Sequence, residues 1–167
     1  VLRNKMKSFA LLIQFYIFCF VKTYKMPNNK VIALDFDGVL CDSANESSNA
    51  AFKCVKKFVP NEEILEEYAH LTDAPDQFKE QMRRFRPIIE TGYENILLAK
   101  MMMLKGQCFH SKDFDFDYIC ENWNDEVKIK LLDAQRVDKD ELIEQFGSVR
   151  DEWMNSDSDS WLNANSF

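Results

Sequence analysis

The stretch VIALDFDGVLCDS, residues 31–43, decides how the rest of the chain is interpreted. Four apolar residues lead directly into two aspartates, Asp35 and Asp37, which are separated by one phenylalanine and followed by Gly38. An apolar run of this length is typical of a short strand that is buried on both faces in a parallel sheet. Gly38 permits a backbone turn that a side chain would obstruct. The stretch therefore predicts a buried strand that ends in a turn carrying two carboxylates.

Two carboxylates at the end of such a strand suit phosphoryl transfer. Asp35 and Asp37 are alternate residues of an extended segment, so their side chains lie on the same side of it, at the strand end where open α/β sheets bind ligands. An oxygen of Asp35 can attack phosphorus in line and form an aspartyl-phosphate. Asp37 can protonate the leaving oxygen and then deprotonate the attacking water. Mg²⁺, bound by the same carboxylates, accepts hard oxygen ligands of this kind. A strand end that exits into solvent is the alternative interpretation.

These residues resemble the first motif of the haloacid dehalogenase superfamily, an apolar strand followed by D-x-D-G-[TV]-L-x-D-S. The resemblance implies an α/β fold with a Rossmann-like core. It also implies that Asp35 is the nucleophile and that Asp37 is the acid/base, with a backbone carbonyl that binds Mg²⁺. The second aspartate favours phosphate ester hydrolysis, because a halide leaving group needs no proton. By this resemblance the protein is a Mg²⁺-dependent phosphatase that acts on a small phosphorylated substrate.

After the motif the sequence predicts helices and no further strand. The first begins at Asp42 or Ser43 and runs to about residue 59, with a buried face made of Ala50, Ala51, Cys54, Val55 and Phe58. The stretch ENILLAKMMMLKG is apolar almost all round, which indicates a helix buried in a bundle. The other helices are expected near 61–71, 75–86, 114–136 and 139–154, and the last is started by Asp138 with Glu141 three residues on, a capping-box pattern. An all-helical segment in this place is similar to the cap domain that many superfamily members carry between their first and second motifs.

Arg86, Glu90 and Tyr93 are the candidate substrate contacts. They lie in RPIIETGYENILL, residues 86–98, which looks like a stretch carried by uncharacterised plant and cyanobacterial hydrolase-like members of the superfamily. The alternative is that Glu90 and Tyr93 belong to the start of a helix and have no functional role. A basic cluster either meets a substrate anion or forms a solvated helix face; its members are Lys79, Arg83, Arg84 and Arg86.

Three segments follow from these patterns: a leader at 1–27, the first core strand and catalytic loop at 28–43, and a helical cap at 44–167. One parallel strand cannot form a sheet alone, so we expect the remainder of the core to be missing from this chain. The later motifs of the superfamily find only weak counterparts, at His70 and Thr72, at Lys128, Lys130 and Lys139, and at Asp151 and Glu152. We therefore expect little or no activity from these residues alone.

Composition excludes several other functions. The net charge of −7 argues against a nucleic-acid partner. Five cysteines without a CxxC pair, and two distant histidines, support neither a zinc site nor a disulfide framework. The run DFDFD, residues 113–117, copies the first three ligands of an EF-hand. Tyr118 and Asn124 replace the glycine and glutamate that such a loop requires, which favours a polar loop entering a helix.

Residues 8–21, SFALLIQFYIFCFV, form an apolar run preceded by Arg3, Lys5 and Lys7. This pattern is typical of a signal sequence or membrane anchor, although a span needs roughly 20 residues. A translation start at Met26 is the alternative. The rival function is a non-catalytic helical interaction module, or a pseudoenzyme fragment, with a membrane-anchoring leader. A membrane is a partner only if 8–21 is retained, and the compartment stays open between the cytoplasm and a plastid or other organelle.

Overall fold

The computed structural model describes residues 40–106 and 116–165. The predicted strand, Asp35, Asp37 and the apolar run at 8–21 lie outside the described residues. The described part is mostly helical, as predicted. Ile64 and Leu104 form an isolated antiparallel bridge within it. No helix of the described residues is both long and apolar enough to span a bilayer.

The elements follow one another along the chain with short connections. In order they are α2 (Ala44–Phe58), the 3₁₀ helix η1 (Asn61–Glu63), α3 (Glu66–Ala69), α4 (Asp76–Phe85), the 3₁₀ helix η2 (Arg86–Ile88), α5 (Gly92–Met103), α6 (Phe116–Asn122), α7 (Asp125–Gln135), α8 (Lys139–Ser156) and α9 (Ser158–Asn163).

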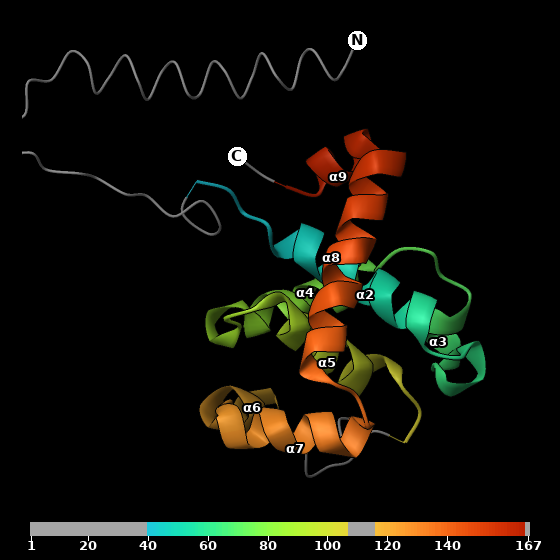
Figure 1. The fold of residues 1–167 in the computed structure, drawn as a ribbon. Helices are drawn as coiled ribbons and strands as arrows, with labels where there is room; N and C mark the ends of the chain where they lie inside the picture. The colour runs from blue at the N-terminus through green and yellow to red at the C-terminus, as the bar shows by residue number, and fades with distance from the viewer. Residues whose placement is uncertain (1–39, 107–115, 166–167) are drawn as a thin grey trace, which may run out of the picture. The chain divides into compact units, whose positions relative to one another are not determined.

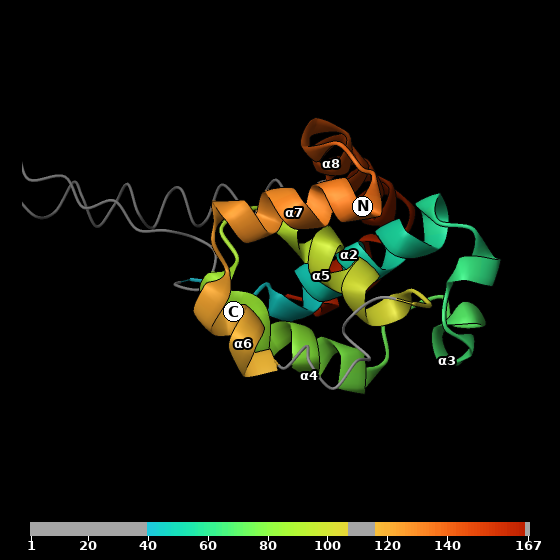
Figure 2. The same cartoon turned by 90° about the horizontal axis from the view of Figure 1, so that it is seen from below.

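Helix α5 is the centre of the core. It packs against α2, α4, α7 and α8, and Figures 1 and 2 show it surrounded by them. Leu97, Leu98 and Ala99 are consecutive, so they point in different directions around the helix, and all three are 0% exposed. The all-round apolar sequence therefore correctly predicted a helix buried in a bundle.

Helix α2 buries the predicted face, with one exception. Ala50, Ala51, Cys54 and Val55 are all buried, but Phe58 is 43% exposed. The prediction for Phe58 was wrong because it is the last residue of α2, and its ring lies beside the ammonium of Lys57, 5.5 Å from the ring centroid.

The prediction of one continuous helix at 61–71 was wrong. The backbone there forms η1 and the short α3, because two of its groups bond to the end of α5 instead. Leu65 N–H donates to the carbonyl of Met103 at 2.8 Å, and Lys105 N–H donates to the carbonyl of Glu63 at 2.9 Å. These long-range, strand-like bonds compete with a continuous helix.

The helix predicted at 114–136 is two helices. The chain breaks between α6 and α7, and the side chain of Asn124 caps α7 by accepting a hydrogen bond from Val127 N–H at 3.1 Å. An asparagine at this position favours a helix start over a helix interior.

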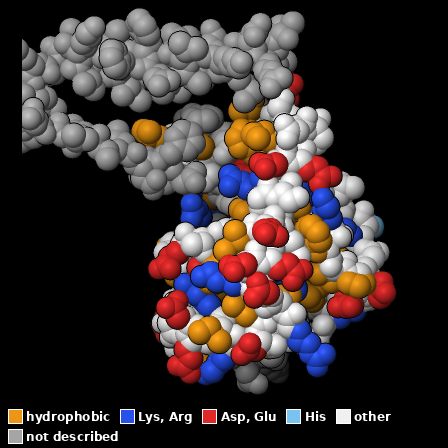
Figure 3. Space-filling model, in the orientation of Figure 1, with side chains coloured by type: hydrophobic (Ala, Val, Ile, Leu, Met, Phe, Trp, Pro, Cys, Tyr) orange, Lys and Arg blue, Asp and Glu red, His pale blue; other side chains and the backbone are white. Residues whose placement is uncertain are grey.

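Helix α8 begins where its cap was predicted. The Asp138 carboxylate accepts hydrogen bonds from the N–H groups of Asp140 at 2.8 Å and Glu141 at 3.2 Å. Asp157 caps α9 in the same way, accepting from Ser160 N–H at 3.1 Å. The face shown in Figure 3 carries acidic and basic side chains interspersed rather than one basic surface.

Candidate functional site

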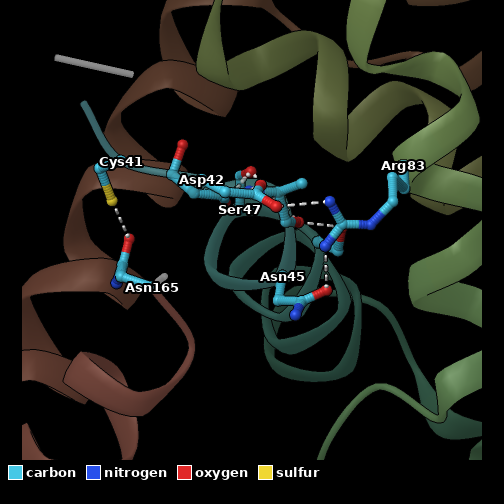
Figure 4. A network of polar contacts seen from close by, with 9 residues as sticks. Cys41, Asp42, Asn45, Ser47, Arg83 and Asn165 are labelled. Atoms are coloured by element: carbon cyan, nitrogen blue, oxygen red, sulfur yellow. Dashed lines mark hydrogen bonds and ion pairs between the residues drawn. The ribbon is translucent and has the colours of Figure 1, made fainter. Parts of the chain in front are cut away.

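The described residues begin shortly after the aspartate motif, and a polar network fixes the segment that leads into α2. Arg83, on α4, donates to the Asp42 carboxylate at 2.6 Å and to the Asn45 amide oxygen at 3.0 Å (Figure 4). Ala44 N–H donates to the other carboxylate oxygen of Asp42 at 3.0 Å. The hydrogen bond from Arg83, followed by that from Ala44, holds the pKa of Asp42 below its usual range. Arg83 therefore anchors the start of α2.

The predicted basic cluster does not converge on one point. Lys79 pairs with Asp76 at 3.4 Å, and the Arg84 guanidinium lies 3.7 Å from the centroid of the Phe116 ring. With Arg83 on Asp42, three of the four cations have separate intramolecular contacts. The fourth, Arg86, lines a cavity.

That cavity, of about 450 Å³, lies where the N-terminal parts of α2 and α5 meet α8. Arg86, Glu90 and Tyr93 all line it, so the structure brings together the three side chains that the sequence singled out as substrate contacts. Tyr93 is only 5% exposed, and burial, with the negative charge of Glu94 next, raises the pKa of its hydroxyl. We call this cavity the α2–α5–α8 pocket.

Glu46 forms the pocket wall on α2 and was missed by sequence reasoning. It is 0% exposed, and its Oε1 atom accepts hydrogen bonds from Arg150 Nε at 2.7 Å and from Trp161 Nε1 at 3.2 Å. Its Oε2 atom is buried and has no hydrogen-bond partner. The signal was spacing: Glu46 precedes Ala50 and Cys54 at intervals of four, so it shares their buried face.

Two further polar side chains of the pocket are also more than nine-tenths buried. Ser43 is 5% exposed and Asn95 is 6% exposed. Within the described residues, neither the Ser43 hydroxyl nor the Asn95 amide makes a hydrogen bond. Together with Glu46 Oε2, these groups make three lining polar groups without a hydrogen-bond partner in the part of the chain that the structure describes.

Two glycines line the same pocket for different reasons. A Cβ atom added at Gly92 would lie 2.5 Å from the Phe146 ring, so Gly92 lets that ring approach α5. A Cβ atom added at Gly147, inside α8, would meet nothing within 4 Å. Close packing therefore does not require a glycine at position 147.

A second buried carboxylate, Glu94, is fully paired. It is 1% exposed and contacts Lys128 at 3.2 Å. It also accepts hydrogen bonds from Trp123 Nε1 at 3.0 Å, from Glu90 N–H at 3.1 Å and from the Thr91 hydroxyl at 3.2 Å. The cluster joins α5 to α7 and leaves Lys128 occupied, with a further contact to the Glu90 carboxylate at 3.3 Å.

Three further residues compared with the later superfamily motifs also have structural contacts. Lys130 pairs with Glu126 on the surface of α7, and Lys139 lies 5.0 Å from the centroid of the Tyr93 ring. Glu152 pairs with Lys57. The contacts of Lys139 and Glu152 join α8 to α5 and to α2.

No group of three His, Cys, Asp or Glu side chains in the described part is arranged to hold a metal ion. Asp113 and Asp115 lie outside that part, as do the two motif aspartates. Asp117 lies in the first turn of α6. Comparisons of the chain with protein-family models, with curated proteins and with solved structures find no match.

Proposed function

We propose that the protein is a haloacid dehalogenase-like phosphohydrolase, a Mg²⁺-dependent phosphatase with an aspartyl-phosphate intermediate, and that the described helices are its cap. The sequence support is VIALDFDGVLCDS at 31–43. The structural observation that carries the proposal is the closeness of two distant parts of the helical body. The Cys41 thiol donates to the Asn165 side-chain oxygen at 3.6 Å, across 124 residues of chain (Figure 4).

A cap inserted between two motifs of a core must leave that core and return to it at neighbouring points. Cys41, just before α2, and Asn165, just after α9, meet that requirement. Closely spaced ends are the geometry that lets one domain be inserted into another. An interaction module would not need this arrangement.

The proposed chemistry uses Asp35 and Asp37 in two steps. An Asp35 oxygen attacks phosphorus, the bond to the ester oxygen breaks, and Asp37 gives its proton to the leaving alkoxide. Asp37 then removes a proton from water, which attacks phosphorus and releases inorganic phosphate and the Asp35 carboxylate. Mg²⁺, which carboxylate oxygens suit, would neutralise negative charge on the phosphoryl oxygens.

In this proposal the α2–α5–α8 pocket receives the rest of the substrate. Ser43 lines the pocket and follows Asp37 by six residues, a length that the backbone spans in at most about 22 Å. In this proposal Arg86, Glu90 and Tyr93 contact the leaving group of the ester.

The proposal is tested with protein expressed from its complete reading frame. We expect Mg²⁺-dependent release of phosphate from para-nitrophenyl phosphate, lost on chelation. We also expect fluoroberyllate with Mg²⁺, a mimic of an aspartyl-phosphate that needs no particular substrate, to give a bound fluorine NMR signal. Asp35→Asn should reduce phosphate release by at least about 10³-fold and abolish the bound fluorine signal.

Asp133→Asn, the same change at an exposed position of α7, is the matched control and should leave both readouts unchanged. Phosphate release or a fluoroberyllate signal that survives Asp35→Asn would overturn the proposal. Absence of both from the complete protein would overturn it as well and favour the non-catalytic interaction module.

A further inference from the structure

We propose that the α2–α5–α8 pocket binds a small, neutral, polyhydroxylated molecule, and that Glu46 Oε2 accepts a hydrogen bond from one of its hydroxyl groups. The inference uses only the described residues and does not depend on the chemistry of Asp35.

The first argument is the unpaired oxygen of Glu46. A buried carboxylate oxygen without a donor carries a desolvation penalty, and native proteins rarely leave one. Both donors of the Glu46 carboxylate, Arg150 and Trp161, are directed at Oε1. Glu46 is a lining residue of the same pocket, and its buried Oε2 has no partner within the described residues. A ligand hydroxyl supplies the missing donor.

The second argument is charge. Arg150 already pairs with Glu46, and Lys128 pairs with Glu90, the other carboxylate lining the pocket. Arg86 lines the pocket as well, so a ligand cation would add an uncompensated charge to a site that already holds this guanidinium, which is unfavourable. A neutral hydroxyl satisfies Oε2 without this penalty. Ser43 and Asn95, each able to donate and accept, suit further hydroxyl groups of the same molecule.

The third argument is the space. About 450 Å³ is within the range of small-molecule sites. Gly147, an exposed residue in the interior of α8, also lines the pocket, and a Cβ atom added there would meet nothing within 4 Å, although glycine is a poor residue for a helix interior. The Phe146 ring and the Ile89 side chain give the pocket an apolar wall, against which the carbon skeleton of a polyol can pack.

Trp161 provides a specific reporter because its indole N–H donates to Glu46. The other two indoles are internal controls: that of Trp123 donates to Glu94, and that of Trp153 donates to the Ser160 hydroxyl. The experiment titrates the full chain with glycerol, myo-inositol and D-glucose and follows the three indole signals by nitrogen–proton NMR. We expect a saturable shift of the Trp161 signal with at least one probe, larger than those of Trp123 and Trp153.

Two variants test the site. Glu46→Gln removes the charge-assisted bond and should weaken binding by about tenfold or more. Gly147→Leu should abolish it by filling the pocket. Its side chain enters open space and glycine is replaced by a better helix former, so the variant should stay folded. Glu152→Gln, on α8 but outside this pocket, is the matched control and should bind as the original chain does.

D-glucosamine, which replaces one hydroxyl of D-glucose by an ammonium, separates the two kinds of donor. Stronger binding of glucosamine than of glucose would overturn the preference for a neutral ligand. If no neutral probe gives a saturable shift of the Trp161 signal, the proposal is overturned and Glu46 Oε2 is left to water. Unchanged binding in a folded Gly147→Leu variant would place the ligand elsewhere. None of these outcomes alters the fluoroberyllate signal expected from Asp35, so the two proposals fail separately.

Discussion

Two glutamates of this bundle are completely or almost completely buried, and their surroundings differ. Glu94 has donors on both carboxylate oxygens. Glu46 has donors on one oxygen only. A fully satisfied buried carboxylate stabilises the packing around it, whereas a half-satisfied one lowers stability unless something else supplies the donor. We therefore assign Glu94 to the fold and Glu46 to ligand binding.

Lys128→Met tests the structural role of the Glu94 cluster. The change removes the ammonium that is 3.2 Å from a carboxylate that is 1% exposed, and leaves that carboxylate buried without its cation. We expect the free energy of unfolding to fall by about 3 kcal/mol, as measured by urea denaturation. Lys130→Met, at an exposed pair on the same helix, should change it by no more than about 0.5 kcal/mol.

The same variant predicts a pH dependence. Burial opposes the charge of Lys128, but hydrogen bonds and charges from Glu94 and Glu90 outweigh it and raise the pKa above the usual 10.5. The stabilisation by Lys128 is therefore fully present below pH 10.5 and is lost as the pH rises through the raised, folded-state value. Above neutral pH, the stability difference between the original chain and Lys128→Met should shrink only in that alkaline range. A difference that shrinks between pH 9 and pH 7 would contradict this assignment.

At the scale of elements, α8 carries a glycine in its interior that packing does not require. Gly147→Ala should raise the free energy of unfolding by about 0.5–1 kcal/mol, because alanine loses less backbone entropy and the added methyl group meets nothing within 4 Å. Gly92→Ala is the opposite case and should lower it, since its methyl group would lie 2.5 Å from the Phe146 ring. Thermal unfolding of both variants measures this; destabilisation by Gly147→Ala would show that the pocket is closed.

Helices with a clear apolar pattern and a local cap could be predicted from the sequence. Helices α2, α4, α5 and α8 fall close to their expected bounds, and Asp138 caps α8 as expected. The segment at 61–71 could not be predicted correctly, because its backbone bonds to the end of α5, about 40 residues away in the sequence. Periodicity reports only contacts between near neighbours.

The candidate site likewise contains residues that could be predicted from the sequence and one that could not. Arg86, Glu90 and Tyr93 lie close together in sequence, and the structure places all three in one pocket. Glu46 was missed because its partners, Arg150 and Trp161, lie 104 and 115 residues away. No local pattern connects residues at such a separation.

For the whole molecule, the two proposals have a joint consequence. The alcohol released from a phosphate ester would occupy the α2–α5–α8 pocket after the phosphoryl group has moved to Asp35. A polyol that shifts the Trp161 signal should therefore inhibit the Mg²⁺-dependent hydrolysis, raising the apparent KM by competing with substrate at the free enzyme and lowering the apparent kcat where it also binds the phosphoenzyme. Gly147→Leu should remove this inhibition. Inhibition that lowers kcat alone would separate the pocket from the catalytic reaction.

The packing of α2 against α8 also has a consequence for synthesis on the ribosome. The ion pair of Glu46 with Arg150 spans 104 residues, and the apolar face of α2 is covered by α5 and α8. At usual rates of translation, α2 leaves the ribosome about 5–20 s before α8 does. During that interval Cys54, which is 1% exposed in the folded protein and whose thiol donates to the Gln145 carbonyl of α8, lacks part of its final surroundings. The nascent chain is therefore a substrate for chaperones that bind exposed apolar segments, and completion of α8 ends that exposure.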